Sequence, residues 1–329
     1  MPDIAKEQLP LKPILEVNGL RKYFASKQPG SWRTKTLKAV DNVSFHLYEG
    51  ETYGLVGESG CGKSTLGRTL LRLTEPTEGT ALYNGKDLFS LPGKELQASR
   101  KQLQMVFQDP FASLHPRKSI GAALTEPLII HRIGTPAERY SRVLEILRVV
   151  GLQPSHYDRL PHELSGGQRQ RVVLARALIL EPKLVICDEP VSALDVIIQA
   201  QILNLMKQLQ QDFKLTYLFI AHDLGVVRHI SDRIGVMYLG KLVEEAPTDQ
   251  LFASPKHPYT RALLSAVPKS DPAGKRDRIL LEGDVPSPLD PPTGCTFHPR
   301  CPLATERCRK EIPVKREVAD RHFAACHLA

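Results

Sequence analysis

The sequence predicts an α/β fold in which helices cover a mostly parallel sheet, with an antiparallel β part and an inserted α-helical segment. Three observations predict this fold. Apolar strands alternate with helical patterns along much of the chain. A glycine-rich motif, "GESGCGKST" at 57–65, stands between a predicted strand and a predicted helix. Between about 117 and 163, apolar residues recur at helical spacing.

The composition is that of an ordinary globular protein. Of 329 residues, 42% are hydrophobic and 24% are charged, which excludes global disorder. The net charge of +8 is spread over short pairs and triplets of Lys and Arg, a pattern typical of a solvated surface. No stretch approaches the roughly 18–20 apolar residues of a membrane span. Charges and prolines in residues 1–17 do not fit a signal peptide, so we expect a soluble, cytoplasmic protein.

The first part of the chain contains predicted strands and the glycine-rich turn. Strands are expected at 14–17 and 43–47, with a polar loop at 26–38 between them. The elements that follow are a strand at 51–57, a helix at 63–73 and a strand at 103–108.

Strand–helix alternation resumes after the helical segment. The predicted elements are a strand at 183–190, a helix at 200–213, and strands at 216–223 and 233–240. From about 247 the chain becomes rich in proline, so we place a boundary near 250. We expect a first domain at 1–250, with a helical subdomain at about 110–165, and a small cysteine-containing extension at 251–329.

The glycine-rich motif has the spacing of a phosphate-binding loop. Its glycines let backbone N–H groups close around phosphates, Lys63 can reach the β- and γ-phosphates, and the Ser64 hydroxyl can bind Mg²⁺. We interpret Cys61 as a small residue that fills the loop rather than as a reactive thiol. The predicted nucleotide-binding residues here are Gly57, Glu58, Ser59, Gly60, Cys61, Gly62, Lys63, Ser64 and Thr65.

Two carboxylates end the apolar strand "LVICDE" at 184–189. A buried strand would deliver Asp188 and Glu189 to the sheet edge beside the phosphate-binding loop. Asp188 is suited to hold Mg²⁺ directly or through water, and Glu189 to act as a base toward the attacking water or to orient it. Acidic residues also begin many helices, so this pair gains its meaning from the loop that precedes it.

Two further polar residues stand at predicted strand ends. Gln108 could contact Mg²⁺ or the water through its amide, and His222 could contact the γ-phosphate. A single Gln is more often a turn residue, and a single His more often a surface or core residue. Both therefore depend on the other motifs.

A second glycine loop, "HELSGGQRQR" at 162–171, precedes a helical run and has the pattern of an anion site at a helix N-terminus. Here the sequence resembles the nucleotide-binding subunits of ABC transporters. "LSGGQ" at 164–168 resembles the signature loop of that family, "SALD" at 192–195 its D-loop, and "AHD" at 221–223 its switch histidine. The motifs occur in family order over about residues 14–250.

The resemblance implies an ATPase that works as a pair. In this family two subunits associate head to tail, and each ATP lies between one phosphate-binding loop and the signature loop of the partner. Ser165, Gly166, Gly167 and Gln168 would then contact the ATP of the partner, and Asp195 of the D-loop is likewise expected to bind nucleotide. Hydrolysis opens the pair, which is a two-state switch.

An aromatic side chain is expected to stack on the adenine. "RKYF" at 21–24 resembles the aromatic loop of the family. Phe24 is our expected stacking residue, with Tyr23 as the alternative, and a half-buried aromatic ending a strand is the structural alternative.

The tail restricts the resemblance to one group within the family. "SPKHPYTRALLSAVP" and "EGDVPSPLDPPTGC" resemble the ATP-binding subunits of bacterial dipeptide and oligopeptide importers. This implies a second, non-identical ATPase subunit, two membrane permease subunits that dock around Gln108 to Pro127, and an extracytoplasmic peptide-binding protein. The chain would lie on the cytoplasmic face of the bacterial inner membrane. The alternatives are import of another small solute such as nickel, or a soluble ABC ATPase that acts on nucleic acid. We expect no nucleic acid partner for this chain.

Four of the six cysteines crowd the tail, at Cys295, Cys301, Cys308 and Cys326. Four thiolates can ligate an iron–sulfur cluster or zinc. The tail lacks the closely spaced cysteine pairs of structural zinc sites, and relatives in the peptide-importer family carry a 4Fe–4S cluster on similarly placed cysteines. We therefore expect a 4Fe–4S cluster, with zinc or free thiols as alternatives.

Overall fold

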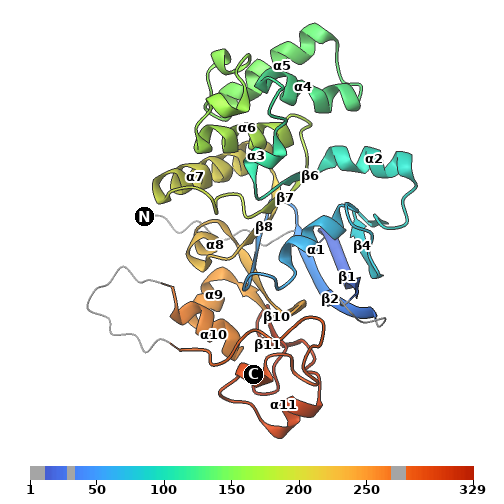
Figure 1. Ribbon diagram of the computed structural model, residues 1–329, viewed down its shortest axis with the longest axis vertical. Coiled ribbons are helices and arrows are strands. Elements are labelled where there is room, and N and C mark those ends of the chain that lie inside the picture. The colour runs from blue at the N-terminus through green and yellow to red at the C-terminus, as the bar shows by residue number, and fades with distance from the viewer. Residues whose placement is uncertain (1–11, 28–33, 268–278) are drawn as a thin grey trace.

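The computed structural model describes residues 12–27, 34–267 and 279–329. Its helical segment lies at one end of the long axis and its tail at the other, with the main sheet between them (Figure 1). In this described part of the chain, no helix combines the length and the apolar character that crossing a bilayer requires.

The main sheet has eight strands in the order β11-β12-β10-β9-β3-β8-β7-β6. Its parallel strands are β3 (Thr52–Val56), β6 (Leu103–Val106), β7 (Leu184–Asp188), β8 (Thr216–Ala221) and β9 (Arg233–Tyr238). Strands β3, β7 and β8 are buried along their whole length, which explains their continuous apolar sequence. Because Val56 pairs with Ala221 and Asp188 with Ile220, the phosphate-binding loop and the two carboxylates meet at one edge.

A second, antiparallel sheet has the order β2-β1-β4-β5. Its strands are β1 (Pro13–Lys27), β2 (Thr34–Tyr48), β4 (Glu78–Tyr83) and β5 (Lys86–Asp87). The polar loop expected at 26–38 was wrong in part, because β1 and β2 continue to pair as far as Lys27 and Thr34. A two-stranded extension needs no apolar alternation when its faces meet solvent, and the strand signal is therefore weak there. Residues 28–33 lie outside the described residues.

Helices cover the main sheet and form the inserted segment. The bounds are α1 (Lys63–Leu70), α2 (Gly93–Gln102), α3 (Pro110–Ser113), α4 (Ile120–Ile130), α5 (Pro136–Val149), α6 (Gly166–Leu178), α7 (Val196–Phe213), α8 (Leu224–Ile230), α9 (Thr248–Ala253), α10 (Pro258–Ser265) and α11 (Glu306–Lys310). Short 3₁₀ turns are η1 (Pro154–His156), η2 (Pro161–Glu163) and η3 (His298–Arg300). One apolar core joins the inserted helices to α6, α7 and the β7–β8 face, and a second lies between α1 and the antiparallel sheet.

The tail returns to the main sheet. Strand β10 (Lys241–Pro247) runs antiparallel to β9 and pairs with β12 (His322–Ala324), which pairs in turn with β11 (Arg316–Ala319). Phe297 is buried against Tyr238 and Tyr259. The mixed α/β class expected from the sequence is confirmed, whereas the three strands at this edge have no counterpart in the sequence prediction.

Candidate active site

The phosphate-binding loop connects β3 to α1. Gly60 and Gly62 have φ values of +79° and +105°, and a Cβ atom on Gly62 would lie 2.0 Å from the Ala39 carbonyl oxygen. Only glycine fits that position. The loop thereby turns its backbone toward a pocket of about 460 Å³.

The pocket gathers most of the predicted loop residues and adds others. From the loop it is lined by Ser59, Gly60, Gly62, Lys63, Ser64 and Thr65. Gly57, Glu58 and Cys61 do not line it. Cys61 is buried, and this burial raises the pKa of its thiol, so the thiol stays protonated and fills space beneath the loop.

Lys63 lies folded back on the loop. Its side chain is buried, and Nζ donates to the carbonyl oxygens of Gly57, at 2.8 Å, and Glu58, at 3.1 Å. An ammonium satisfied by carbonyls near the mouth of an anion site can turn to phosphate oxygens when these arrive.

Ser64 and Asp188 form a pair that fits Mg²⁺. The Ser64 hydroxyl donates to Oδ1 of Asp188 at 2.7 Å. The other carboxylate oxygen, Oδ2, is buried and has no hydrogen-bond partner among the described residues; the nearest cation is Arg68, at 3.9 Å. Burial raises the pKa of Asp188. A buried acceptor that lacks a donor, beside a hydroxyl oxygen, suits a hard divalent cation.

Glu189 lies between Gln108 and His222. Nε2 of Gln108 donates to Oε2 of Glu189 at 3.1 Å, and Nδ1 of His222 lies 3.2 Å from the same oxygen. All three residues line the pocket, although they come from three separate strand ends. Glu189 has a φ of +48°, a conformation that costs energy for a residue other than glycine and is common where side-chain aim matters.

The second glycine loop lies outside the pocket of its own chain. Ser165 caps α6: its hydroxyl accepts from the Gln168 N–H, and the Gln168 side chain accepts from the Ser165 N–H. Gly166 and Gly167 occupy the first turn, where N–H groups have no intrahelical acceptor. Asp195 caps α7 by accepting from the Ile198 N–H. None of these residues lines the pocket.

The two aromatic candidates differ in position. Phe24 lines the pocket and is 37% exposed, with Lys22 Nζ 4.6 Å from its ring centroid. Tyr23 instead donates its hydroxyl to Asp41 at 2.6 Å, and burial and this hydrogen bond raise the pKa of Tyr23 to about 12.

Three pocket residues were missed by the sequence analysis: Leu37, Ala39 and Pro288. Leu37 and Ala39 belong to β2, in and beside the stretch that we had read as a loop. Pro288 comes from the tail, where its carbonyl oxygen accepts from the Lys38 N–H at 3.3 Å. No local pattern marks Pro288, since its place depends on how the tail folds back.

The four tail cysteines lie near one another. Burial, with smaller contributions from the neighbouring thiols of Cys308, Cys326 and Cys301, raises the pKa of Cys295 to about 11. The Cys295 N–H also donates to the Cys308 carbonyl oxygen at 2.8 Å. Within the described ranges, however, no three Cys, His, Asp or Glu side chains are grouped as the ligands of a metal ion. The cluster therefore stays a prediction.

Curated relatives match almost the whole chain, and two family models match parts of it. A model described as "ABC transporter" matches residues 40–192, and one described as "Oligopeptide/dipeptide transporter, C-terminal region" matches residues 243–308. The oligopeptide transport ATP-binding protein AppF of Bacillus subtilis is 57% identical over 96% of this chain and 97% of its own length. The dipeptide transport ATP-binding protein DppF of Haemophilus influenzae is 50% identical over 95% and 96%, respectively.

Solved structures share the fold. The dimeric ATP-binding cassette MJ0796, in a post-hydrolysis state bound to ADP and phosphate, has a TM-score of 0.63 and 30% identity, over 71% of this chain and 98% of that chain. CbiO1 from Clostridium perfringens has a TM-score of 0.63 and 27% identity, over 74% and 91%. This chain therefore belongs to the ABC transporter family and, within it, to the oligopeptide and dipeptide transport ATP-binding proteins. It is an ATPase of the ABC type.

Proposed function

We propose that this ATPase binds and hydrolyses ATP in the pocket of Lys63 and Glu189, and that this hydrolysis powers the import of dipeptides and oligopeptides. The observation that carries the proposal is that Gln108 and His222 both contact Glu189, and that all three line one pocket together with Lys63 of the phosphate-binding loop. Peptide cargo is supported by the match of residues 243–308 and by the names of the relatives AppF and DppF.

Each residue has a role in hydrolysis that its position supports. Lys63 would leave the carbonyls of the loop and bind the β- and γ-phosphates, and Phe24 would stack on the adenine. Bound Mg²⁺, held by Ser64 and Asp188 with Gln108 nearby, would neutralise phosphate charge. Glu189 would accept a proton from the attacking water. The water oxygen would bond to the γ-phosphorus as the bond from that phosphorus to the bridging oxygen of ADP breaks. His222 would hold Glu189 and donate to the γ-phosphate.

The signature loop would serve the ATP of a second, non-identical ATPase subunit. Ser165, Gly166, Gly167 and Gln168 lie outside the pocket of their own chain, and the first turn of α6 offers N–H groups to an anion. Asp195, at the start of α7, would lie at the same interface. In this arrangement each bound ATP joins the two subunits, and hydrolysis releases them.

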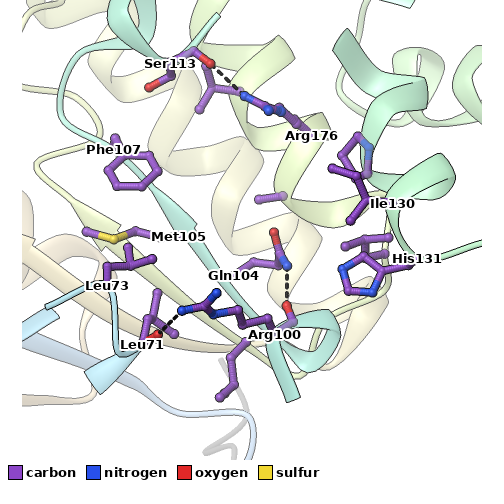
Figure 2. Close-up of a pocket in the computed structure, with 15 residues that line it drawn as sticks. Leu71, Leu73, Arg100, Gln104, Met105, Phe107, Ser113, Ile130, His131 and Arg176 are labelled. Carbon is purple, nitrogen blue, oxygen red and sulfur yellow. Dashed lines mark hydrogen bonds between the residues drawn. The ribbon is translucent and has the colours of Figure 1, made fainter. Parts of the chain in front are cut away.

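A groove of about 260 Å³ supports docking of a helix from a membrane permease subunit. Figure 2 shows Phe107, the residue after β6, and Ile130, at the end of α4, facing it; they are 38% and 55% exposed. Of the range Gln108 to Pro127 predicted for docking, Ser113 and Pro127 line this groove. Such docking would keep the chain on the cytoplasmic face of the membrane.

The groove connects the two nucleotide motifs physically. Arg176, on the helix that follows the signature loop, donates to the Ser113 carbonyl oxygen at 2.7 Å and pairs with Glu126 at 3.5 Å (Figure 2 shows the first contact). Phe107 is the residue before Gln108. A helix bound in the groove would therefore contact residues next to the nucleotide pocket of this chain and residues on the helix that begins at its signature loop.

For the tail, we propose that Cys295, Cys301, Cys308 and Cys326 hold a 4Fe–4S cluster, with zinc as the alternative. The gathering of four of the six cysteines in the last 35 residues supports the proposal, as does the hydrogen bond from the Cys295 N–H to the Cys308 carbonyl oxygen. Anaerobic purification followed by iron, sulfide and zinc analysis tests it. About four irons and four sulfides per chain are expected for the cluster. One zinc per chain would support the alternative. If neither iron nor zinc is found, the thiols are free and the proposal is wrong.

The transport function is tested in the native host. Deletion of the gene should abolish uptake of a labelled dipeptide, and the wild-type gene should restore it. Undiminished peptide uptake together with lost uptake of nickel or another solute would reassign the cargo.

Partners are tested with the tagged Glu189→Gln chain, trapped with ATP and purified in mild detergent. A second ATPase and two polytopic membrane proteins are expected. Ile130→Arg, added in the groove, should remove the membrane proteins but not ATP binding. Val314→Arg is the matched control, because Val314 is an exposed apolar residue of the tail, 78% accessible. Nucleic acid without membrane proteins would contradict the proposal.

A further inference from the structure

The phosphate-binding loop is attached to the C-terminal tail through Glu58. This residue is the second of the motif, and its side chain does not line the nucleotide pocket. Its carboxylate accepts two hydrogen bonds from Arg300, 242 positions later: Nη1 lies 2.9 Å from Oε2, and Nη2 lies 3.2 Å from Oε1. This two-pronged geometry is the strongest form of an Arg–carboxylate contact.

The contact is largely removed from solvent. The Arg300 side chain is 8% exposed and that of Glu58 27%. An exposed ion pair contributes little to structure, whereas a shielded, bidentate pair defines the relative position of its two backbones. Losing one partner would leave the other charge poorly solvated.

Glu58 is held at two further points. Its main-chain N–H donates to the hydroxyl of Tyr259, a buried residue of α10, at 2.9 Å. Its carbonyl oxygen accepts from Nζ of Lys63 at 3.1 Å. Side chain, N–H and carbonyl of this single residue thus lead to the tail, to α10 and to the proposed phosphate-binding lysine.

The tail core in turn orients Arg300. Phe297, three residues earlier, packs edge-on against Tyr238 with ring centroids 5.2 Å apart and contacts Tyr259 at 5.4 Å. The Arg300 guanidinium lies 6.0 Å from the Tyr238 ring centroid. Its place is therefore set by packed aromatic side chains rather than by a free surface loop.

The loop needs such an anchor. Gly60 and Gly62 give it backbone conformations open to many alternatives, and each alternative must be given up when phosphate binds. We propose that Arg300 is a positioning residue for ATP: through Glu58 it holds the phosphate-binding loop in the conformation that receives the phosphates. The proposal rests on the proposed role of Lys63 in the same loop.

The test uses the full chain in its purified complex and separates ATP affinity from turnover. Arg300→Gln should raise the KM and the dissociation constant for ATP about tenfold, while kcat at saturating ATP stays within about twofold. Glu58→Gln should do the same, and the double variant should be no weaker than either single one, because both remove one interaction. Arg300→Lys, which keeps the charge but not the fork, should lie in between.

Arg309→Gln is the matched control, since Arg309 is a 60%-exposed arginine of the same tail. It should bind ATP like the wild type. A role limited to attaching the tail predicts a different result: lower thermal stability of the nucleotide-free complex with unchanged ATP affinity, and that result would overturn the proposal. If Arg300→Gln does not fold, Glu58→Gln still tests the contact from the loop side.

Lys63→Ala distinguishes failure of the positioning role of Arg300 from failure of the proposed phosphate site. If it loses ATP while the Arg300 and Glu58 variants bind normally, the positioning role alone is wrong. If Lys63→Ala itself binds ATP like the wild type, the proposed phosphate site is wrong.

Discussion

The hydroxyl of Ser64 donates a hydrogen bond of 2.7 Å to Oδ1 of Asp188, across 124 positions of sequence. Parallel pairing causes this meeting, because β3 and β7 both pair with β8 in register and end at one edge of the sheet. The bond leaves Oδ2 of Asp188 buried without a hydrogen-bond partner among the described residues. Ser64 and Asp188 thereby offer neighbouring oxygens for the proposed cation.

Asp188→Asn should raise the Mg²⁺ concentration for half-maximal ATPase activity by about 10- to 100-fold, because the amide keeps the shape but removes the charge. The measurement is ATPase rate against free Mg²⁺. Asp212→Asn, at an exposed position on α7, is the control and should leave the curve unchanged. An unaltered Mg²⁺ requirement in the Asp188 variant would place the metal elsewhere.

Glu189→Gln should bind ATP but hydrolyse it about 100- to 10,000-fold more slowly, the usual loss when a general base is removed. The amide still reaches Gln108 and His222 but cannot accept the proton. Single-turnover hydrolysis and nucleotide binding are measured together. Glu306→Gln, at a 78%-exposed carboxylate of the tail, is the matched control. Normal turnover in the Glu189 variant would remove this residue from the chemistry.

Phe24→Ala should weaken ATP binding by about 5- to 150-fold, since stacking of a base on an aromatic ring contributes about 1–3 kcal/mol. Phe24→Trp should retain binding. Tyr23→Phe loses only the hydrogen bond to Asp41 and should bind ATP normally. If the Tyr23 variant were the weak one, the two aromatic residues would exchange roles.

Because of His257, we expect the folded protein to lose stability in mild acid. It is buried, its Nδ1 accepts from the Tyr259 N–H, and burial lowers its pKa to about 4, although Glu244 favours the charged form and Arg261 opposes it. Because the unfolded chain takes up this proton near pH 6.5 and the folded one only near pH 4, stability is full above pH 6.5 and falls between these values. The expected loss from pH 7 to pH 5 is about 2 kcal/mol.

Denaturant unfolding at pH 7 and pH 5 measures this loss. His257→Asn keeps an acceptor for the Tyr259 N–H at the start of α10 and should reduce the pH dependence. His298, half-buried on the tail, provides the control position for a His→Asn substitution. An equally steep pH dependence in the His257 variant would show that other groups cause the loss.

Short-range sequence patterns predicted much of the fold and of the candidate site. The buried strands, α1, α7 and the two glycine loops were predictable because apolar runs, helical spacing and glycine each act within a few residues. The hairpin extension near Thr34 was missed, since exposed antiparallel strands need no regular apolar alternation.

The sequence by itself determined the candidate residues for the chemistry, among them Lys63, Asp188 and Glu189, because their types and spacing reflect local backbone requirements. Only the tertiary structure decided that Pro288 lines the pocket, that β12 pairs with β10, and that Arg300 donates two hydrogen bonds to Glu58. Those contacts join positions far apart in the chain. They depend on the path of the tail and on the packing of Phe297 against two tyrosines, which no short pattern encodes.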